Sequence, residues 1–114
     1  MLCQKNKTLK IPIKREYFDA IHSGEKTEEY RAYTPFWNSR LLTLNKEINT
    51  YEARKYDTIL FRNGYNSDSP TMEVEWEGLF VDRFEDVPDT APDVERLGFA
   101  IQLGKVLKTE NYKP

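Results

Sequence analysis

The chain has 114 residues, of which 39% are apolar and 32% charged, a balance that excludes a disordered chain and is typical of one folded domain. Its 17 Lys and Arg residues against 19 Asp and Glu residues give a formal net charge of −2. A protein that holds nucleic acid by bulk electrostatics is normally basic, so any nucleic-acid role requires a local pocket or patch.

Metal, disulfide and membrane chemistry have little support in the sequence. Cys3 is the only cysteine, so it cannot form an internal disulfide, and no Cys/His cluster offers a metal site. His22, the only histidine, lies in an expected helix and is interpreted as a surface or packing residue. No apolar run approaches the roughly 20 residues that cross a membrane, and the first residues lack the apolar core of a signal peptide. We therefore expect a cytoplasmic protein without a metal, a cofactor or a membrane partner.

The first two predicted elements are a strand and a helix. Residues 8–14 alternate between apolar and polar side chains, which predicts a half-buried strand. Pro12 has no N–H to donate, so this should be an edge or bulged strand. Residues 15–23 change to a helical period, and Gly24 follows as a natural left-handed terminator. Three side chains of this helix are expected in the core: Tyr17, Phe18 and Ile21.

A second strand and a second helix are predicted next. Residues 26–32 alternate, and one face carries Thr27, Glu29 and Arg31. Thr34 followed by Pro35 is typical of a helix start, with a hydroxyl cap and proline at the first position. The helix presents an apolar stripe of Phe36, Trp37, Leu41 and Leu42. Residues 45–55 lack a firm period and are expected to form a loop, with at most a helical turn over 50–53.

Three further segments follow in the second half. Residues 56–63 hold the most compact apolar run and predict a buried strand, and 63–70 form the strongest turn cluster. Residues 71–83 alternate up to Gly78, and a glycine inside a strand predicts a bulge or bend. The alternate glutamates of this strand are interpreted as a solvated face: Glu73, Glu75 and Glu77.

A helical turn over 92–97 and a strand over 98–107 complete the predicted elements. The strands after residue 55 follow one another mostly as hairpins. The pattern predicts an α+β fold, a small β-barrel of about five to six strands flanked by two or three short helices.

The segment from Gly24 to Arg31 carries the densest group of ionisable side chains. Gly24 permits a tight turn and the close approach of another group. Lys26 follows the turn, where it is either a solvated surface lysine, an anion ligand, or a base or nucleophile with a lowered pKa. Glu29 and Arg31 share a face, and if they are buried they must be paired. Such a pair is either structural or the floor of a pocket that reads an unstacked base.

Aromatic and polar side chains nearby extend this candidate site. Aromatic rings stack on bases with roughly 1–3 kcal/mol per base, although most aromatic residues belong to cores. Two of the nearby aromatic residues, Trp37 and Tyr65, are the expected ligand contacts. The others are Tyr30, Tyr33 and Phe36. Arg62 and Asn63, at the end of a strand, are predicted to face a cleft. The predicted ligand-binding residues are Gly24, Lys26, Glu29, Arg31, Trp37, Arg62, Asn63 and Tyr65.

The segment from Ile13 to Arg31 resembles the opening of an ASCH domain, a branch of the PUA-like superfamily. The hallmark of that family is G-x-K-x-x-E-x-R after a short helix, matched here by Gly24, Lys26, Glu29 and Arg31. The expected strands at 57–61 and 98–103 also lie where the family places barrel strands. The resemblance implies one PUA-like domain over residues 1–114, with the motif lining a cleft.

The resemblance also implies a function, namely an RNA- or nucleobase-binding module. Some small members hydrolyse N4-acetylcytidine and one branch cleaves RNA, which gives the alternative of a hydrolase with Lys26 and Glu29 as reactive groups. In the amidohydrolase branch a threonine stands three residues after the catalytic lysine, where this chain has Glu29. A carboxylate there can still serve as a general base. A third alternative is a protein-interaction domain in which the Glu29–Arg31 pair is structural.

Overall fold

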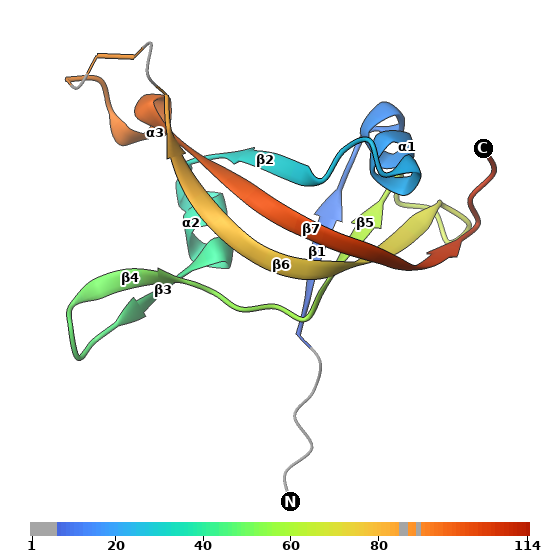
Figure 1. Cartoon of the computed structure of the whole chain (residues 1–114), viewed down its shortest axis with the longest axis horizontal. Coiled ribbons are helices and arrows are strands. Elements are labelled where there is room, and N and C mark those ends of the chain that lie inside the picture. Colours follow the sequence, from blue (N-terminus) through green and yellow to red (C-terminus); the bar gives the residue numbers. More distant parts are fainter. Residues whose placement is uncertain (1–6, 85–86, 89) are drawn as a thin grey trace, which may run out of the picture. The chain divides into compact units, whose positions relative to one another are not determined.

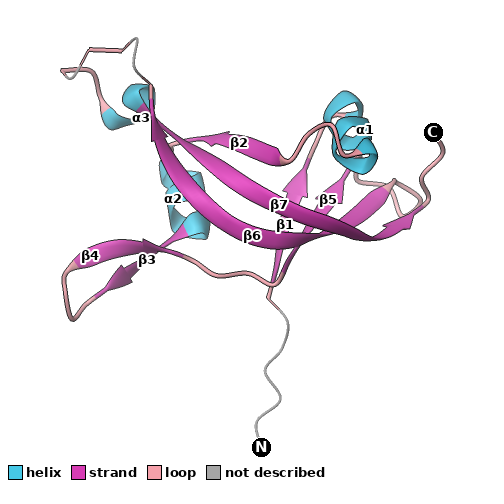
Figure 2. Cartoon of the chain, viewed as in Figure 1, coloured by secondary structure: helices cyan, strands magenta, loops and turns pink. Residues whose placement is uncertain are grey.

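The computed structural model describes residues 7–84, 87–88 and 90–114, so Cys3 lies outside the described residues. Figure 1 labels the elements and Figure 2 distinguishes helices from strands. The helices are α1 (Arg15–Ser23), α2 (Pro35–Leu41) and α3 (Asp93–Arg96). The strands are β1 (Thr8–Pro12), β2 (Glu28–Ala32), β3 (Leu42–Asn45), β4 (Thr50–Ala53), β5 (Thr58–Arg62), β6 (Thr71–Arg83) and β7 (Leu97–Glu110).

A mixed sheet of five strands is the main element of the fold. Its strand order is β1-β5-β6-β7-β2, and a second sheet of two strands pairs β3 with β4. Strand β1 runs parallel to β5, whereas β5 is antiparallel to β6 and β2 is antiparallel to β7. Short helices accompany these sheets, so the predicted class, a small barrel-like α+β fold, is confirmed.

The chain forms two compact units, and the long strands β6 and β7 contribute to both. Unit 1 comprises residues 7–27, Lys55–Glu77 and Leu103–Pro114. Unit 2 comprises Glu28–Arg54 and Gly78–Gln102. The assignment of the whole chain to one domain stays a prediction.

Unit 1 contains the pairing of β1 with β5. In their register Leu9 faces Ile59 and Ile11 faces Phe61, and all four side chains are buried. Strand β1 is the edge of the sheet and Pro12 is its last residue. The edge position predicted from this proline is therefore confirmed, because an edge strand needs fewer backbone donors.

Helix α1 of unit 1 ends where the sequence predicts, but one side chain differs. Gly24 adopts a left-handed φ of 87° and donates its N–H to the carbonyl oxygen of Ile21 at 3.1 Å. Phe18 and Ile21 are buried, whereas Tyr17 is 44% exposed, so the prediction of a buried Tyr17 is wrong. Phe18 and Ile21 define the buried face by their three-residue spacing, and Tyr17 lies at the edge of that face.

Unit 2 contains β2, its partner β7 and helix α2. The N–H of Trp37 donates to the hydroxyl oxygen of Thr34 at 3.4 Å, which confirms the predicted cap before Pro35. Leu41 is fully buried, but Phe36 is 53% exposed and Leu42 already belongs to β3. Only the end of the predicted apolar stripe therefore packs in a core.

The prediction of a loop over residues 45–55 is wrong, because the end of β3 and all of β4 lie there. Leu44 pairs with Tyr51 and Asn45 with Thr50. Asn49 closes the turn with a φ of 52°, a conformation that asparagine tolerates. All residues of β4 are exposed. A strand with no buried face shows no hydrophobic alternation, which is why its period was not visible, and the helical turn over 50–53 is also wrong.

The second half of the chain follows the predicted order of elements. Strand β6 extends over the predicted residues, and Gly78 within it has a φ of 146°, a value that residues with a side chain rarely adopt. Helix α3 confirms the helical turn predicted over 92–97, and β7 begins directly after it at Leu97.

Candidate functional site

Strand β2 carries the last charged residues of the motif, and its side chains alternate between two faces. Glu29 is buried, at 3% exposure, while its neighbour Tyr30 is 57% exposed. Arg31 lies on the face of Glu29, as the alternation predicts. The strand therefore presents charges inward and an aromatic ring outward.

The inward face holds an ion pair between a buried carboxylate and a half-buried guanidinium. Nη1 of Arg31 lies 3.0 Å from Oε2 of Glu29, and the two side chains are 21% and 4% exposed. This contact is close but not aligned as a hydrogen bond, so its attraction is chiefly Coulombic. The other carboxylate oxygen, Oε1, accepts from the N–H of Tyr30 at 3.3 Å. A buried carboxylate is tolerated when it is paired in this way.

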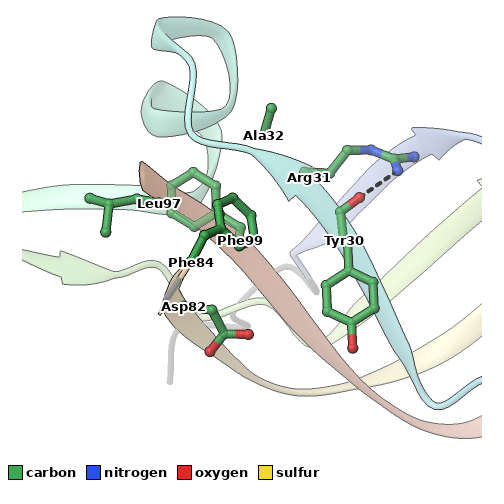
Figure 3. Close-up of a pocket in the computed structure, with 8 residues that line it drawn as sticks. Tyr30, Arg31, Ala32, Asp82, Phe84, Leu97 and Phe99 are labelled. Carbon is green, nitrogen blue, oxygen red and sulfur yellow. Dashed lines mark hydrogen bonds between the residues drawn. The ribbon is translucent and has the colours of Figure 1, made fainter. Parts of the chain in front are cut away.

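Arg31 also joins this pair to helix α2. Its Nη1 donates to the carbonyl oxygen of Tyr30 at 2.9 Å, the bond drawn in Figure 3. Its guanidinium carbon lies 5.2 Å from the centre of the Trp37 ring, within cation–π range. Three of the predicted site residues, Glu29, Arg31 and Trp37, are thus brought together in unit 2.

A pocket of about 340 Å³ lies in unit 2 and is bordered by the exposed ring of Tyr30. Besides Tyr30, its walls include Asp82 near the end of β6, Phe84 just after that strand, and Leu97, Gly98 and Phe99 at the start of β7. Figure 3 shows these side chains. The volume falls in the range of roughly 300–1,000 Å³ that is typical of small-molecule sites. Arg31 and Ala32 complete the lining.

The ring of Phe84 approaches the backbone at Gly98. A Cβ atom at Gly98 would lie 2.9 Å from Cζ of Phe84, closer than real Cβ contacts allow. The N–H of Phe84 donates to the carbonyl oxygen of Arg96 at 2.8 Å, which fixes the backbone before the ring. Phe84 is 49% exposed, whereas Phe99 is buried and stacks on Tyr33 at 5.1 Å between ring centres. One aromatic ring of the pocket, Phe99, is therefore held in the core, while the other, Phe84, is partly exposed to solvent.

Apart from the guanidinium of Arg31, which is a donor, the polar side chains that line this pocket can accept hydrogen bonds. The hydroxyl of Tyr30 donates to the Glu28 carboxylate, and this hydrogen bond raises the pKa of Tyr30, with smaller contributions from burial and from the negative charges of Glu28 and Asp82. Because the hydroxyl proton is held by Glu28, the oxygen of Tyr30 can accept a hydrogen bond from a ligand. The carboxylate of Asp82 accepts as well.

Gly24 and Lys26 of the motif lie in unit 1. A Cβ atom at Gly24 would meet nothing within 4 Å, so the left-handed backbone, and not a close approach, requires glycine there. The N–H of Lys26 donates to the carbonyl oxygen of Ala20 at 3.0 Å, which explains why β2 begins at Glu28 and not at Lys26. Nζ of Lys26 lies 5.5 Å from the centre of the Tyr17 ring.

The other predicted residues of unit 1 surround the turn over 63–70. Nε and Nη2 of Arg62 donate to the carbonyl oxygens of Gly64 and Asn66, each at 2.5 Å. Nδ2 of Asn63 donates to the carbonyl oxygen of Ile13 at 2.9 Å. These bonds give both side chains a structural role in the turn. Tyr65 is 82% exposed, and ligand contact by these three residues stays a prediction.

Sequence reasoning missed Asp82, Phe84 and Leu97 as lining residues. A signal was present, because Phe80 and Asp82 of β6 and Phe84 just after it alternate along the chain, and both phenylalanines are exposed, at 61% and 49%. Exposed aromatic rings on either side of a carboxylate are unusual in a strand that only serves the core.

Two features are absent from residues 7–84, 87–88 and 90–114, namely a side-chain cluster for a metal ion and a helix that could span a membrane. In those residues no group of three or more His, Cys, Asp and Glu side chains is placed to hold a metal ion. None of the helices there combines the length and the apolar character that a membrane span requires.

Comparisons of the chain with protein-family models, with curated proteins and with solved structures found no match. The resemblance to ASCH domains therefore stays a prediction from the motif. The chemistry of the pocket beside Tyr30 is what remains to indicate a function.

Proposed function

We propose that the protein binds an unstacked nucleobase, in RNA or in a nucleoside, in the pocket beside Tyr30. The observation that carries the proposal is a pocket of about 340 Å³ that combines exposed aromatic rings with a carboxylate, Asp82. RNA is commonly recognised through bases that are splayed out, stacked on aromatic side chains and hydrogen-bonded at their edges.

Stacking supplies the affinity in this proposal. Tyr30 and Phe84 are 57% and 49% exposed, so each ring has surface for a base to cover. Base–aromatic stacking contributes about 1–3 kcal/mol per base. The remaining apolar wall, from Leu97 to Phe99, excludes water from the bound nucleobase.

Acceptor groups supply the selectivity. Asp82 and the hydroxyl oxygen of Tyr30 accept hydrogen bonds, so a base with an exocyclic amino group fits better than uracil. Carboxylates pair with the amino group of cytosine in other nucleic-acid interfaces. Glu28 and Asp82 also repel a phosphate, in agreement with a chain of net charge −2. The pocket is therefore proposed to read the base and not the backbone.

A hydrolase that uses Lys26 and Glu29 as reactive groups stays a prediction. The Glu29 side chain is 4% exposed and is engaged by Arg31 and by the N–H of Tyr30. These contacts favour a positioning role for Glu29, which holds β2 behind the pocket, over general base catalysis.

The test is calorimetric titration with cytidine, uridine and a short single-stranded RNA at low salt. We expect cytidine to bind more tightly than uridine, and Tyr30→Ala to weaken cytidine binding about tenfold, the equivalent of about 1.4 kcal/mol of lost stacking. Tyr65→Ala is the matched control, since it removes a still more exposed tyrosine that does not line the pocket. The absence of binding by all three ligands to the folded protein, or an equal loss in both variants, would refute the proposal.

A further inference from the structure

A second pocket of unit 2, of about 460 Å³, lies between helix α2 and the β3–β4 hairpin. Helix α2 contributes Asn38 and Ser39, and the hairpin contributes Thr43 and Tyr51. Tyr33 and Arg54 complete its polar lining. Neither the motif nor the proposed base pocket includes any of these residues.

The pocket carries a single charge, and that charge is positive. Among the described residues that line it, Arg54 is the only ionised side chain, in a chain whose net charge is −2. The N–H of Arg54 donates to the carbonyl oxygen of Leu41 at 2.8 Å, and its Nε donates to that of Leu42 at 2.9 Å. These two bonds fix the backbone and the plane of the guanidinium. Its terminal nitrogens have no protein acceptor among the described residues.

Hydroxyl and amide groups surround this cation. Thr43, Tyr33 and Tyr51 each bring a hydroxyl to the pocket, and Tyr51 is 68% exposed. The amide oxygen of Asn38 is buried without a hydrogen-bond partner among the described residues. A buried acceptor of this kind gains free energy when a donor reaches it. The lining therefore suits a ligand that has an oxyanion together with a hydroxyl group.

We propose that this pocket binds a phosphate group attached to a hydroxyl-bearing sugar. A planar guanidinium with two available terminal nitrogens matches two oxygens of one phosphate, and hydroxyls from β3 and β4 complete the set of donors. The ring of Tyr51 offers a face for the sugar or the base beyond it. The shared chemistry is that of a ribose phosphate, which either a free nucleotide or an RNA backbone supplies. This site does not rest on the proposed function of the Tyr30 pocket.

The first test follows the backbone amide signals by NMR while inorganic phosphate is added to the whole chain. A single guanidinium with a few hydroxyls predicts a dissociation constant of about 1–10 mM. Shifts are expected at Asn38, Ser39, Thr43, Tyr51 and Arg54. Shifts spread evenly over the lysines and arginines of the surface, or none in this range, would overturn the proposal.

Two variants separate the site from general charge effects. Arg54→Ala is expected to weaken phosphate binding about tenfold. Arg40→Ala is the matched control, because Arg40 is an exposed arginine of α2 outside the pocket whose guanidinium lies 3.5 Å from the Phe36 ring. Tyr51→Phe keeps the fold of the hairpin and is expected to weaken phosphate about threefold by removing one donor. Equal losses in Arg54→Ala and Arg40→Ala, or full binding in both Arg54→Ala and Tyr51→Phe, would reject the site.

Cytidine monophosphate and a short single-stranded RNA identify the source of the phosphate. If both lose affinity in Arg54→Ala, the pocket takes phosphates of an RNA backbone as well as free nucleotides. If only the monophosphate does, the pocket takes free nucleotides. In either case Tyr30→Ala should leave the phosphate-induced shifts unchanged, so this test can succeed or fail independently of base binding.

Discussion

The ion pair of buried Glu29 with half-buried Arg31 and the exposed ring of Tyr30 occupy neighbouring residues of one strand, yet their environments are opposite. Glu29 is 3% exposed, and its charge is compensated inside the protein by Arg31. Tyr30 is 57% exposed and presents most of its ring to solvent. Burial decides between the two roles. A buried charge needs a partner inside the protein, whereas an exposed aromatic ring can be covered by a ligand. Glu29 and Arg31, the charged motif residues of β2, hold the strand in place, and Tyr30 between them is positioned to contact a ligand.

The largest effect is expected from Arg31→Ala. It removes the cation from the buried carboxylate of Glu29 and the partner of the Trp37 ring. Breaking a buried pair from one side costs about 3 kcal/mol or more of the free energy of unfolding. Urea unfolding followed by tryptophan fluorescence measures this loss. Arg40→Ala, at an exposed arginine, should change stability by less than about 0.5 kcal/mol, and a similar loss in both variants would refute a structural role for the pair.

An effect of intermediate size is expected from Gly98→Ala, which should change ligand binding and not stability. The new Cβ would meet Cζ of Phe84 at 2.9 Å, and the half-exposed ring can move aside into the pocket. We expect cytidine affinity to fall about tenfold, while the free energy of unfolding changes by less than about 1 kcal/mol.

Gly104→Ala is the control for that variant, since it makes the same change on the same strand outside the pocket. Its Cβ would contact Cβ of Glu75 at 2.9 Å. Cytidine affinity should stay at the wild-type value in Gly104→Ala. A loss of affinity there as large as in Gly98→Ala would mean that the strand, and not the pocket, governs binding.

The smallest effect is expected from Tyr30→Phe at alkaline pH. The bond to Glu28 raises the pKa of Tyr30 above the ordinary value of 10.0. A group whose pKa is raised by folding contributes stability below its ordinary pKa, and loses that contribution as the pH rises through the raised value. Wild type should therefore lose its small advantage over Tyr30→Phe only above about pH 10. Tyrosinate absorbance, taken as the difference between the two proteins, measures the shift, and a transition at or below pH 10.0 would contradict it.

Local rules predicted most elements of the fold from the sequence. Gly24 and the Thr34–Pro35 pair mark helix ends through backbone conformation and capping, which depend on a few adjacent residues. The β3–β4 hairpin was not predictable in this way, because none of the residues of β4 is buried and its side chains show no period. Tyr17 was misplaced because it lies at the edge of the buried face of α1.

The candidate site was predictable only in part. The alternation of β2 was enough to place Glu29 and Arg31 on one face, but it does not say which face is buried. The aromatic pocket depends on Phe84 and Gly98, which meet because the backbone of Phe84 bonds to Arg96 just before β7. Contacts set by strand pairing between distant segments leave no local pattern in the sequence.

The most direct test of the central claim is an NMR titration of the isotope-labelled protein with cytidine. Shifts of the backbone amides are predicted at the residues that line the pocket, above all Tyr30, Asp82, Phe84 and Gly98. The amides of Arg62 and Tyr65, in unit 1, should stay unchanged. Shifts confined to Lys26 and the turn over 63–70, with none at the pocket, would contradict the account.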